Sequence, residues 1–327
     1  MTAFRAETEF VGWLRARVSS TVPRLKLGIG DDAAIVEVTQ GRELVLKADM
    51  SIEGVHFTRR LHPARSVGHR ALVRSLSDVA AMGGAPKFAL VSLVISKATT
   101  RAWLREFYDG MLALAERFGT TLVGGDTAVA AGKTLIDVMI VGEAERGRAL
   151  RRSGARPDDR IYVSGRLGLS ALGLRLLRSG GGRAHQAAIR AHLYPEPRCA
   201  LGRYLSRKRL ASAAIDVSDG LSTDLAHLCE ASGLGACVWS DRLPTPELAS
   251  ALQPSASDSL DLALNGGEDY ELLFTVPPGK AAQVPARLQG LPLSWIGQIR
   301  RSKGVVLVRP DGKRSTLRPA GYNHFGK

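Results

Sequence analysis

The sequence contains few cysteines, few aromatic residues and no long apolar run. Only Cys199, Cys229 and Cys237 occur among 327 residues, without a CxxC pair, so neither a disulfide scaffold nor a zinc site is predicted. The longest apolar stretch, residues 88–95, is too short to span a membrane, and the first residues lack a basic-then-apolar signal pattern. These absences lead us to expect a cytoplasmic protein with no membrane partner.

The scarcity of aromatic residues also bears on the strongly basic charge balance. Lys and Arg number 45 against 31 Asp and Glu, a net charge of +14, whereas aromatic residues make up 6%. Such a balance can indicate nucleic-acid binding. The arginines are, however, spread over expected helix surfaces such as 203–210, without an aromatic platform. Solvated helix faces are therefore the favoured explanation, and a basic nucleic-acid-binding protein is kept as the alternative from another functional class.

Apolar periodicity predicts alternating helices and strands in the first half of the chain. A helix from residue 64 should end at the glycines of 82–84, and the next helix should bury one stripe at Trp103, Phe107, Met111, Leu114 and Phe118. Strands are expected at 87–95 and 134–143, with a short strand that runs into a glycine turn at 120–127.

A domain boundary is expected where Arg, Gly and Pro collect, at 149–160. The second half then predicts helices at 169–178, 197–210 and 220–232, a strand at 213–217, and a hairpin at Asp311-Gly312. Ser218 and Asp219 are placed to cap the helix at 220–232. The prediction is two α/β domains, 1–148 and 149–327, with a site in the cleft between them.

Four acidic clusters lie in glycine-rich segments: GIGDDAA (28–34), VGGDTA (123–128), DVSDGLSTD (216–224) and NGGEDYE (265–271). Crowded carboxylates repel one another unless a cation lies between them, and Mg²⁺ prefers oxygen ligands together with waters and substrate phosphates. Each aspartate alone could be a helix cap, a turn former or a solvated residue, but the set predicts a magnesium site for phosphate chemistry. The candidate ligands are Asp31, Asp32, Asp49, Asp78, Asp126, Asp216 and Asp219.

Two familiar nucleotide-binding motifs nearly match and are rejected. GIGDDA fits G-x-G-x-x-A, but its two adjacent carboxylates would oppose a bare pyrophosphate. AAGKT (130–134) ends like a P-loop, yet Thr127 stands where the first glycine is needed, and a strand follows instead of a helix. ATP would therefore have to be held by metals and glycine-turn amides of another architecture.

The order of the motifs resembles a known family over nearly the whole chain. GIGDDAAIV, ADMSIEGVHF, SLSDVAAMGGAP, LVGGDT, RRSGARPDD, IDVSDGLSTDL, GGEDYELLF and GYNHF follow one another as in the thiamine-monophosphate kinase family. This family belongs to the superfamily of aminoimidazole ribonucleotide synthetase and selenophosphate synthetase. GGEDYELLF, SDGLSTDL and GYNHF are its more specific marks.

The resemblance implies an aminoimidazole-ribonucleotide-synthetase-like fold of two α/β domains, with the N-terminal domain forming a homodimer through its strands. It implies phosphorylation of thiamine monophosphate to thiamine diphosphate by ATP and several Mg²⁺ ions, with no general base, because the acceptor phosphate is already largely dianionic. The implied metal ligands are Asp32, Asp49, Asp78, Asp126, Asp216 and Asp219. The implied ATP-binding residues are Tyr108, Gly125, Asp126, Arg152 and Ser218, and the implied substrate-binding residues are His56, Glu268 and Tyr322.

One departure from the family pattern concerns the residues before Asp49. Family members commonly have Ser or Thr there, whereas this chain has Lys47-Ala48, so a side-chain hydroxyl ligand is missing and only a backbone carbonyl could replace it. The number of metal ions is therefore left open. Another ATP-using enzyme of the superfamily is the nearest alternative. Selenophosphate synthetase needs a reactive Cys or selenocysteine near its N-terminus, and no Cys precedes Cys199; the hydrogenase-maturation enzyme ends in Cys, whereas this sequence ends HFGK.

Overall fold

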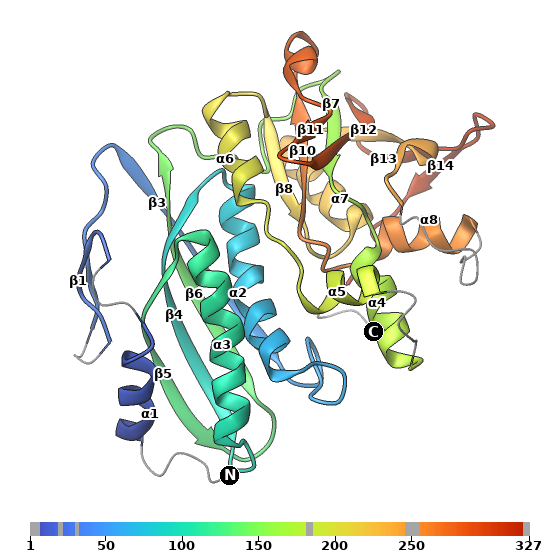
Figure 1. The fold of residues 1–327 in the computed structure, drawn as a ribbon. Helices are drawn as coiled ribbons and strands as arrows, with labels where there is room; N and C mark the ends of the chain where they lie inside the picture. Colours follow the sequence, from blue (N-terminus) through green and yellow to red (C-terminus); the bar gives the residue numbers. More distant parts are fainter. Residues whose placement is uncertain (1–6, 19–21, 30–32, 181–185, 246–255, 323–327) are drawn as a thin grey trace. The chain divides into compact units, whose positions relative to one another are not determined.

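The computed structural model describes residues 7–18, 22–29, 33–180, 186–245 and 256–322 (Figure 1). The chain forms two compact units. Unit 1 consists of Met1–Val79 and Gly84–Gly147, and unit 2 consists of Ala80–Gly83 and Arg148–Lys327. Within the described residues, no helix combines the length and apolarity that a membrane crossing requires.

Unit 1 is built on a four-stranded sheet in the order β3-β6-β4-β5. The strands pair antiparallel except β4 with β5, which run parallel. Helices α2 and α3 cover one face of this sheet (Figure 1). The bounds are α1 Glu7–Arg15, β1 Leu25–Leu27, β2 Ile35–Val36, β3 Arg42–Ile52, α2 Ala64–Ala81, β4 Ala85–Ser96, α3 Arg101–Phe118, β5 Thr121–Ala130 and β6 Leu135–Glu145.

Helix α3 confirms the helix predicted from its apolar stripe. The Thr100 side chain accepts a hydrogen bond from the Trp103 amide at 3.2 Å, which caps the N-terminus, and Gly119 ends the helix at φ 63°. The buried face includes Leu104, Phe107, Met111 and Leu114. The stripe therefore packs against the sheet, as the 3.6-residue period requires.

Strand β5 differs from the glycine turn that the sequence predicted. The strand continues through Gly124-Gly125-Asp126 to Ala130 and pairs in parallel with β4. A Cβ atom on Gly125 would lie 2.0 Å from the carbonyl oxygen of Val91, and Gly125 has φ 150°. The glycine thus permits a close approach of two strand backbones, and a glycine in a strand interior often marks such an approach.

Unit 2 contains an eight-stranded mixed sheet in the order β14-β13-β9-β12-β7-β10-β8, with β11 paired to β12. Only the β13–β9 pair among these is parallel. The strands are β7 Arg160–Ser164, β8 Ala213–Val217, β9 Gly235–Trp239, β10 Glu271–Val276, β11 Arg287–Leu288, β12 Leu291–Arg300, β13 Gly304–Val308 and β14 Arg314–Leu317. The helices are α4 Leu169–Arg178, α5 Gln186–Leu193, α6 Cys199–Arg207, α7 Leu221–Ser232, η2 Ser240–Arg242, α8 Ala256–Asn265 and η4 Pro278–Gln283.

The core of unit 2 lies between this sheet and helix α7. Ile161 and Val163 of β7, Ile215 and Val217 of β8, and Leu225 of α7 are all buried in one cluster. The predicted hairpin is present, because β13 and β14 pair antiparallel around Asp311-Gly312. Two α/β units with mixed sheets confirm the predicted fold class.

Candidate functional site

Lys47 lies between two of the predicted metal ligands in unit 1. Lys47 and Asp49 are two residues apart on β3, so their side chains project from the same face of the sheet, and Asp78 projects from α2. The Lys47 Nζ atom lies 3.3 Å from Asp49 Oδ1 and 3.1 Å from Asp78 Oδ2. Ser75, one helical turn before Asp78, points its hydroxyl at Asp49 Oδ2 over 3.4 Å. The structure therefore brings Asp49 and Asp78 together around an ammonium group.

The charges of Lys47, Asp49 and Asp78 change one another's pKa values. Burial, followed by the negative charge of Asp78, raises the pKa of Asp49 to about 6, although Lys47 acts to lower it. Burial alone would lower the pKa of Lys47, but Asp78 and Asp49 raise it by more. Lys47 is therefore a cation at neutral pH.

Asp126 is placed on the other face of the same sheet. Strand residues alternate between faces, and Asp126 follows Gly125, which is in register with Val91. Asp49 belongs to the row that contains Gly125: Asp49 pairs with Val138, Val138 with Val91, and Val91 with Gly125. Among the described residues of unit 1, Asp126 is thus not gathered with Asp49 and Asp78.

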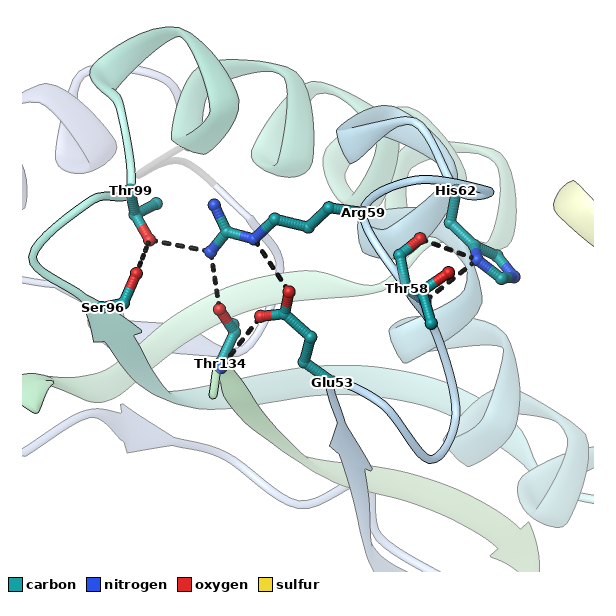
Figure 2. Close-up of polar contacts among 7 residues, drawn as sticks. All are labelled: Glu53, Thr58, Arg59, His62, Ser96, Thr99 and Thr134. Carbon is teal, nitrogen blue, oxygen red and sulfur yellow. Dashed lines mark hydrogen bonds and ion pairs between the residues drawn. The ribbon is translucent and has the colours of Figure 1, made fainter. Parts of the chain in front are cut away.

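His56 lies in the segment that follows β3, and a hydrogen-bond network holds this segment in place. Figure 2 shows the guanidinium group of Arg59 between Glu53, Thr99 and Thr134. Its Nη2 atom donates to Thr99 Oγ1 at 2.8 Å and to Thr134 Oγ1 at 2.7 Å, while Nε lies 3.3 Å from Glu53 Oε1. Burial acts to raise the pKa of Glu53, but hydrogen bonds from Thr134 and the charge of Arg59 lower it overall. The network anchors both ends of the turn that presents His56.

The hydrogen bonds of His56 define its tautomer. The amide of Ile52 donates to His56 Nδ1 at 3.0 Å, so the proton of the neutral ring resides on Nε2. A small cavity beside His56 is also lined by Arg70 and Arg74. The imidazole can therefore donate from Nε2 next to two cationic side chains.

In unit 2, Asp216 and Asp219 flank the turn that leads from β8 into α7. Asp216 lies on β8 and its side chain is buried, with 3% of the residue exposed. Asp224 in the first turn of α7 accepts hydrogen bonds through Oδ2 from the amides of Ser218, Asp219 and Gly220 at 3.0–3.1 Å. The predicted capping role of Ser218 and Asp219 is wrong, because the N-cap residue is Gly220 and no side chain caps there.

Asp224 is a further acidic residue at this turn that was not among the candidate ligands predicted from the sequence. Burial, then the nearby charges of Asp216 and Asp219, raises its pKa to about 8, although the backbone donors act to lower it. Three carboxylates are thus concentrated at one helix N-terminus. The sequence did contain a signal for this role, because Asp224 is a carboxylate in the first helical turn after Ser218-Asp219-Gly220. Such a residue commonly accepts hydrogen bonds from the backbone amides at a helix N-terminus.

The acidic residues of the NGGEDYE segment differ in burial: Asp269 and Glu271 are buried, and Glu268 is only partly buried. Asp269 accepts hydrogen bonds from the Gly168 and Ser170 amides at the start of α4, and Glu271 pairs with Arg198. Glu268 is only partly buried, its amide donates to the carbonyl of Ser218 at 2.8 Å, and it has φ 65°. Glu268 is therefore the acidic residue of this segment that lies beside the Asp216–Asp219 turn and is not fully buried, and its Oε2 atom lies 3.8 Å from His192 Nδ1.

Tyr322 reaches the same turn from the end of the described chain. Its amide donates to the carbonyl oxygen of Asp219 at 3.0 Å, and the Gly321 amide donates to Thr223 Oγ1 at 3.1 Å. A Cβ atom on Gly321 would lie 2.0 Å from the Asp219 carbonyl oxygen, so this approach requires glycine. Tyr322 is exposed, with 48% of its surface accessible to solvent.

The surroundings of two residues that are expected to bind ATP can also be described. Tyr108 on α3 is 1% exposed, and its ring packs against Phe10 and Trp13 of α1 and against Phe107 of α3. The carbonyl of Arg152 accepts a hydrogen bond from Ser232 at the last residue of α7, at the opposite end of that helix from Ser218. Asp31 and Asp32 lie outside the described residues.

Whether these residues fit Mg²⁺ can be judged from their chemistry. Within the described parts of the chain, no group of three or more His, Cys, Asp or Glu side chains has the geometry of a metal site. Mg²⁺ is, however, commonly held by one or two carboxylates plus waters and substrate phosphates. The Asp216–Asp219 turn, whose two carboxylates lie near the carboxyl group of Asp224, fits that requirement, whereas the Asp49–Asp78 pair already holds an ammonium group.

Family models match both halves of the chain. Residues 30–144 match the N-terminal domain of AIR synthase related proteins, and residues 156–309 match the C-terminal domain of the same proteins. These two matches span most of each unit.

Curated relatives and solved structures agree with these matches. The chain is 37% identical to the thiamine-monophosphate kinase of Bacillus subtilis, over 91% of this chain and 93% of that protein. It is 40% identical to that of Salmonella typhimurium, over 94% and 95%. The crystal structure of thiamine-monophosphate kinase from Stenotrophomonas maltophilia superposes with a TM-score of 0.83 at 36% identity, covering 96% of this chain and 99% of that one.

A further solved structure carries ligands. AaThiL complexed with AMPPCP and TMP matches with a TM-score of 0.76 at 34% identity, covering 98% of this chain and 97% of that chain. Hydrogenase maturation protein HypE in complex with ATP, at 21% identity and a TM-score of 0.73, shares the fold.

Proposed function

Because this chain belongs to the thiamine-monophosphate kinase family of AIR synthase related proteins, we propose that it transfers the γ-phosphoryl group of ATP to thiamine monophosphate. The products are ADP and thiamine diphosphate. AMPPCP is an analogue of ATP, and the AaThiL complex with AMPPCP and TMP supports both substrates. Glu268, Tyr322 and the Asp216–Asp219 turn come from three separate segments and meet in unit 2, and this convergence carries the assignment within the chain.

The reaction requires positioning and charge neutralisation more than proton transfer. The phosphate of thiamine monophosphate has a second pKa of about 6, so it is largely dianionic at neutral pH and needs no general base. Two anions must nevertheless approach each other. Mg²⁺, held by Asp216 and Asp219 and by further aspartates of the predicted set, would supply the neutralising charge.

We assign the substrate to His56, Glu268 and Tyr322. His56 offers an Nε2–H donor, and Arg70 and Arg74 line the cavity beside it. Glu268 offers a carboxylate to the cationic or amino-bearing rings of thiamine. Tyr322 offers an exposed aromatic face, and a cation over such a face gains about 0.5–2 kcal/mol.

The assignment of Tyr322 predicts a selective loss of substrate binding. Tyr322→Ala should raise the KM for thiamine monophosphate roughly tenfold, equivalent to about 1.4 kcal/mol, because the stacking face is lost. The KM for ATP should change little. Tyr322→Phe keeps the ring and serves as the matched control in steady-state kinetics. Equal KM values for thiamine monophosphate in Tyr322→Ala and the parent protein would refute the assignment.

The acceptor phosphate should also decide which substrates react. Unphosphorylated thiamine lacks the charge that the metal-bearing turn would anchor and the reach toward the γ-phosphate. The protein should therefore phosphorylate thiamine monophosphate and leave thiamine nearly untouched, which a coupled ADP-release assay with each acceptor measures. Equal rates with both acceptors would contradict the substrate assignment.

We further propose that unit 1 forms a homodimer through the sheet face opposite α2 and α3. This face exposes Leu44, Leu46 and Met50 of β3 and Met139 of β6, with Leu46 65% exposed. A row of large apolar side chains on one sheet face is typical of an interface. Asp126 lies on this face as well.

A charge in the middle of this face should separate the subunits. Leu46→Lys should shift the protein from dimer to monomer in size-exclusion chromatography with light scattering, because paired lysines would be buried. Ile35→Lys, at an exposed apolar position on β2, is the control and should remain dimeric. A dimeric Leu46→Lys protein would place the interface elsewhere.

A further inference from the structure

The residue that departs from the family pattern is also the cation between Asp49 and Asp78. We propose that the ammonium group of Lys47 occupies the position of one divalent ion at this pair. The chain would then bind one metal ion fewer than it would if Asp49 and Asp78 were metal ligands. This inference rests on the proposed function only in assuming that the same aspartates serve a magnesium-dependent site. It concerns the number of ions, not the reaction.

The geometry supports a permanent occupant. Lys47 Nζ lies within ion-pair distance of one oxygen from each carboxylate, 3.3 Å from Asp49 and 3.1 Å from Asp78. Because Lys47 and Asp49 are two residues apart on one face of β3, the strand itself tethers the ammonium group to the pair. A metal ion bridging both oxygens would lie within a few ångströms of this ammonium group and would be repelled by it.

The oxygen ligands that a metal ion would need are also reduced at this position. Lys47 contributes no oxygen from its side chain, and Ala48 has only a methyl group, which points to the opposite face of the sheet. The hydroxyl of Ser75 lies 3.4 Å from Asp49 Oδ2, but its shorter hydrogen bond, at 3.0 Å, goes to the carbonyl oxygen of Val138. Asp49 and Asp78 therefore have a cation between them but few further oxygen ligands for a metal ion.

A lysine differs from a metal ion in what it can neutralise. The single positive charge of Lys47 compensates one of the two carboxylates, whatever the magnesium concentration. A divalent ion would compensate both carboxylates, but it would dissociate when the solution contains no magnesium. The ions that neutralise the substrates would then be held by other predicted ligands, among them Asp216 and Asp219. Removing the lysine should open the Asp49–Asp78 pair to a metal ion.

Counting bound Mn²⁺ tests this directly. Purified full-length protein is dialysed to equilibrium against Mn²⁺ with AMPPCP, and the number of Mn²⁺ ions bound per chain is measured by inductively coupled plasma mass spectrometry. Lys47→Thr removes the ammonium group and adds a hydroxyl, and it should bind one more Mn²⁺ than the parent protein. Lys47→Arg keeps a cation and should match the parent. Lys87→Met, which removes a lysine near the single carboxylate of Glu143, is the control and should also match.

The location of the extra ion is tested by a second substitution. Adding Asp78→Asn to Lys47→Thr should remove the extra Mn²⁺, because the pair then has one carboxylate. Circular dichroism reports whether each variant is folded, and Lys47→Gln replaces Lys47→Thr in the count if the latter is not. Equal Mn²⁺ counts in the parent and the folded Lys47 variant, or a lower count in the variant, would overturn the inference.

The metal count is independent of the reaction. An extra Mn²⁺ in Lys47→Thr would support the inference even if no thiamine diphosphate were formed, and that second result would contradict only the proposed function. Kinase activity with unchanged counts would contradict only the role of Lys47.

Discussion

Asp216→Asn should lower kcat by about 10²–10³-fold, equivalent to roughly 3–4 kcal/mol of transition-state stabilisation, while the protein stays folded. Asp216 is buried near Asp219 and Asp224, and the charges of Asp216 and Asp219 add to burial in raising the pKa of Asp224 to about 8. Asparagine keeps the size and one oxygen but removes the charge that would hold a metal ion against the phosphates. Single-turnover measurements at saturating ATP and thiamine monophosphate separate this loss from weaker binding.

A second aspartate of unit 2 provides the control for this prediction. Asp241 lies exposed in η2, and Asp241→Asn should leave kcat unchanged. Thermal unfolding of both variants shows whether structure is retained. If Asp216→Asn turned over at the parental rate, Asp216 would have no part in binding the catalytic metal.

Glu271→Ala should lower the free energy of unfolding by about 3 kcal/mol or more, because it leaves the charge of Arg198 largely buried without its partner. The two side chains form a bidentate pair, with Arg198 Nε 2.7 Å from Glu271 Oε2. Ser164 also donates its hydroxyl to Glu271 Oε2, and the Leu272 amide donates to Ser164 Oγ at 2.9 Å. One carboxylate therefore joins β7, β10 and the start of α6.

Denaturant unfolding of matched variants measures this loss. Glu37→Ala removes an acid whose ion pair with Lys26, at 3.0 Å, is exposed on both sides, and it should cost at most about 1 kcal/mol. A Glu271→Ala protein as stable as Glu37→Ala would show that the Arg198 charge is relieved in another way.

Much of the fold was predictable where one period dominated the sequence. The α3 stripe predicted a helix because its apolar residues recur on one face and Gly119 ends it. Gly124 and Gly125 predicted a turn where the structure has a continuous strand, since a glycine pair can equally mark a turn or a close strand contact. Only the pairing with β4 distinguishes the two, and that pairing joins residues more than 30 positions apart.

The candidate site was predictable as a set of residue types more than as an arrangement. The order of the motifs implied Glu268 and Tyr322 as substrate-binding residues, and the structure places both beside the Asp216–Asp219 turn. Spacing could not tell that Asp126 and Asp49 lie on opposite sheet faces, because the register of β5 sets this. Nor could it tell that Asp224, a helix residue, would bind the turn amides.

Lys47 illustrates the same limit. The sequence showed that a hydroxyl was missing before Asp49, but the position of the ammonium group depends on the alternation of β3 and on the approach of Asp78 from α2. A contact between a strand and a helix 30 residues away is a tertiary fact, and local pattern does not encode it.

Phosphorus-31 NMR of the purified protein with ATP, thiamine monophosphate and Mg²⁺ tests the central claim most directly. The proposed function predicts that the thiamine monophosphate resonance is replaced by the two coupled resonances of thiamine diphosphate, with one ADP formed for each. Release of inorganic phosphate from ATP with thiamine monophosphate left unchanged, or no reaction of a folded protein, would contradict it.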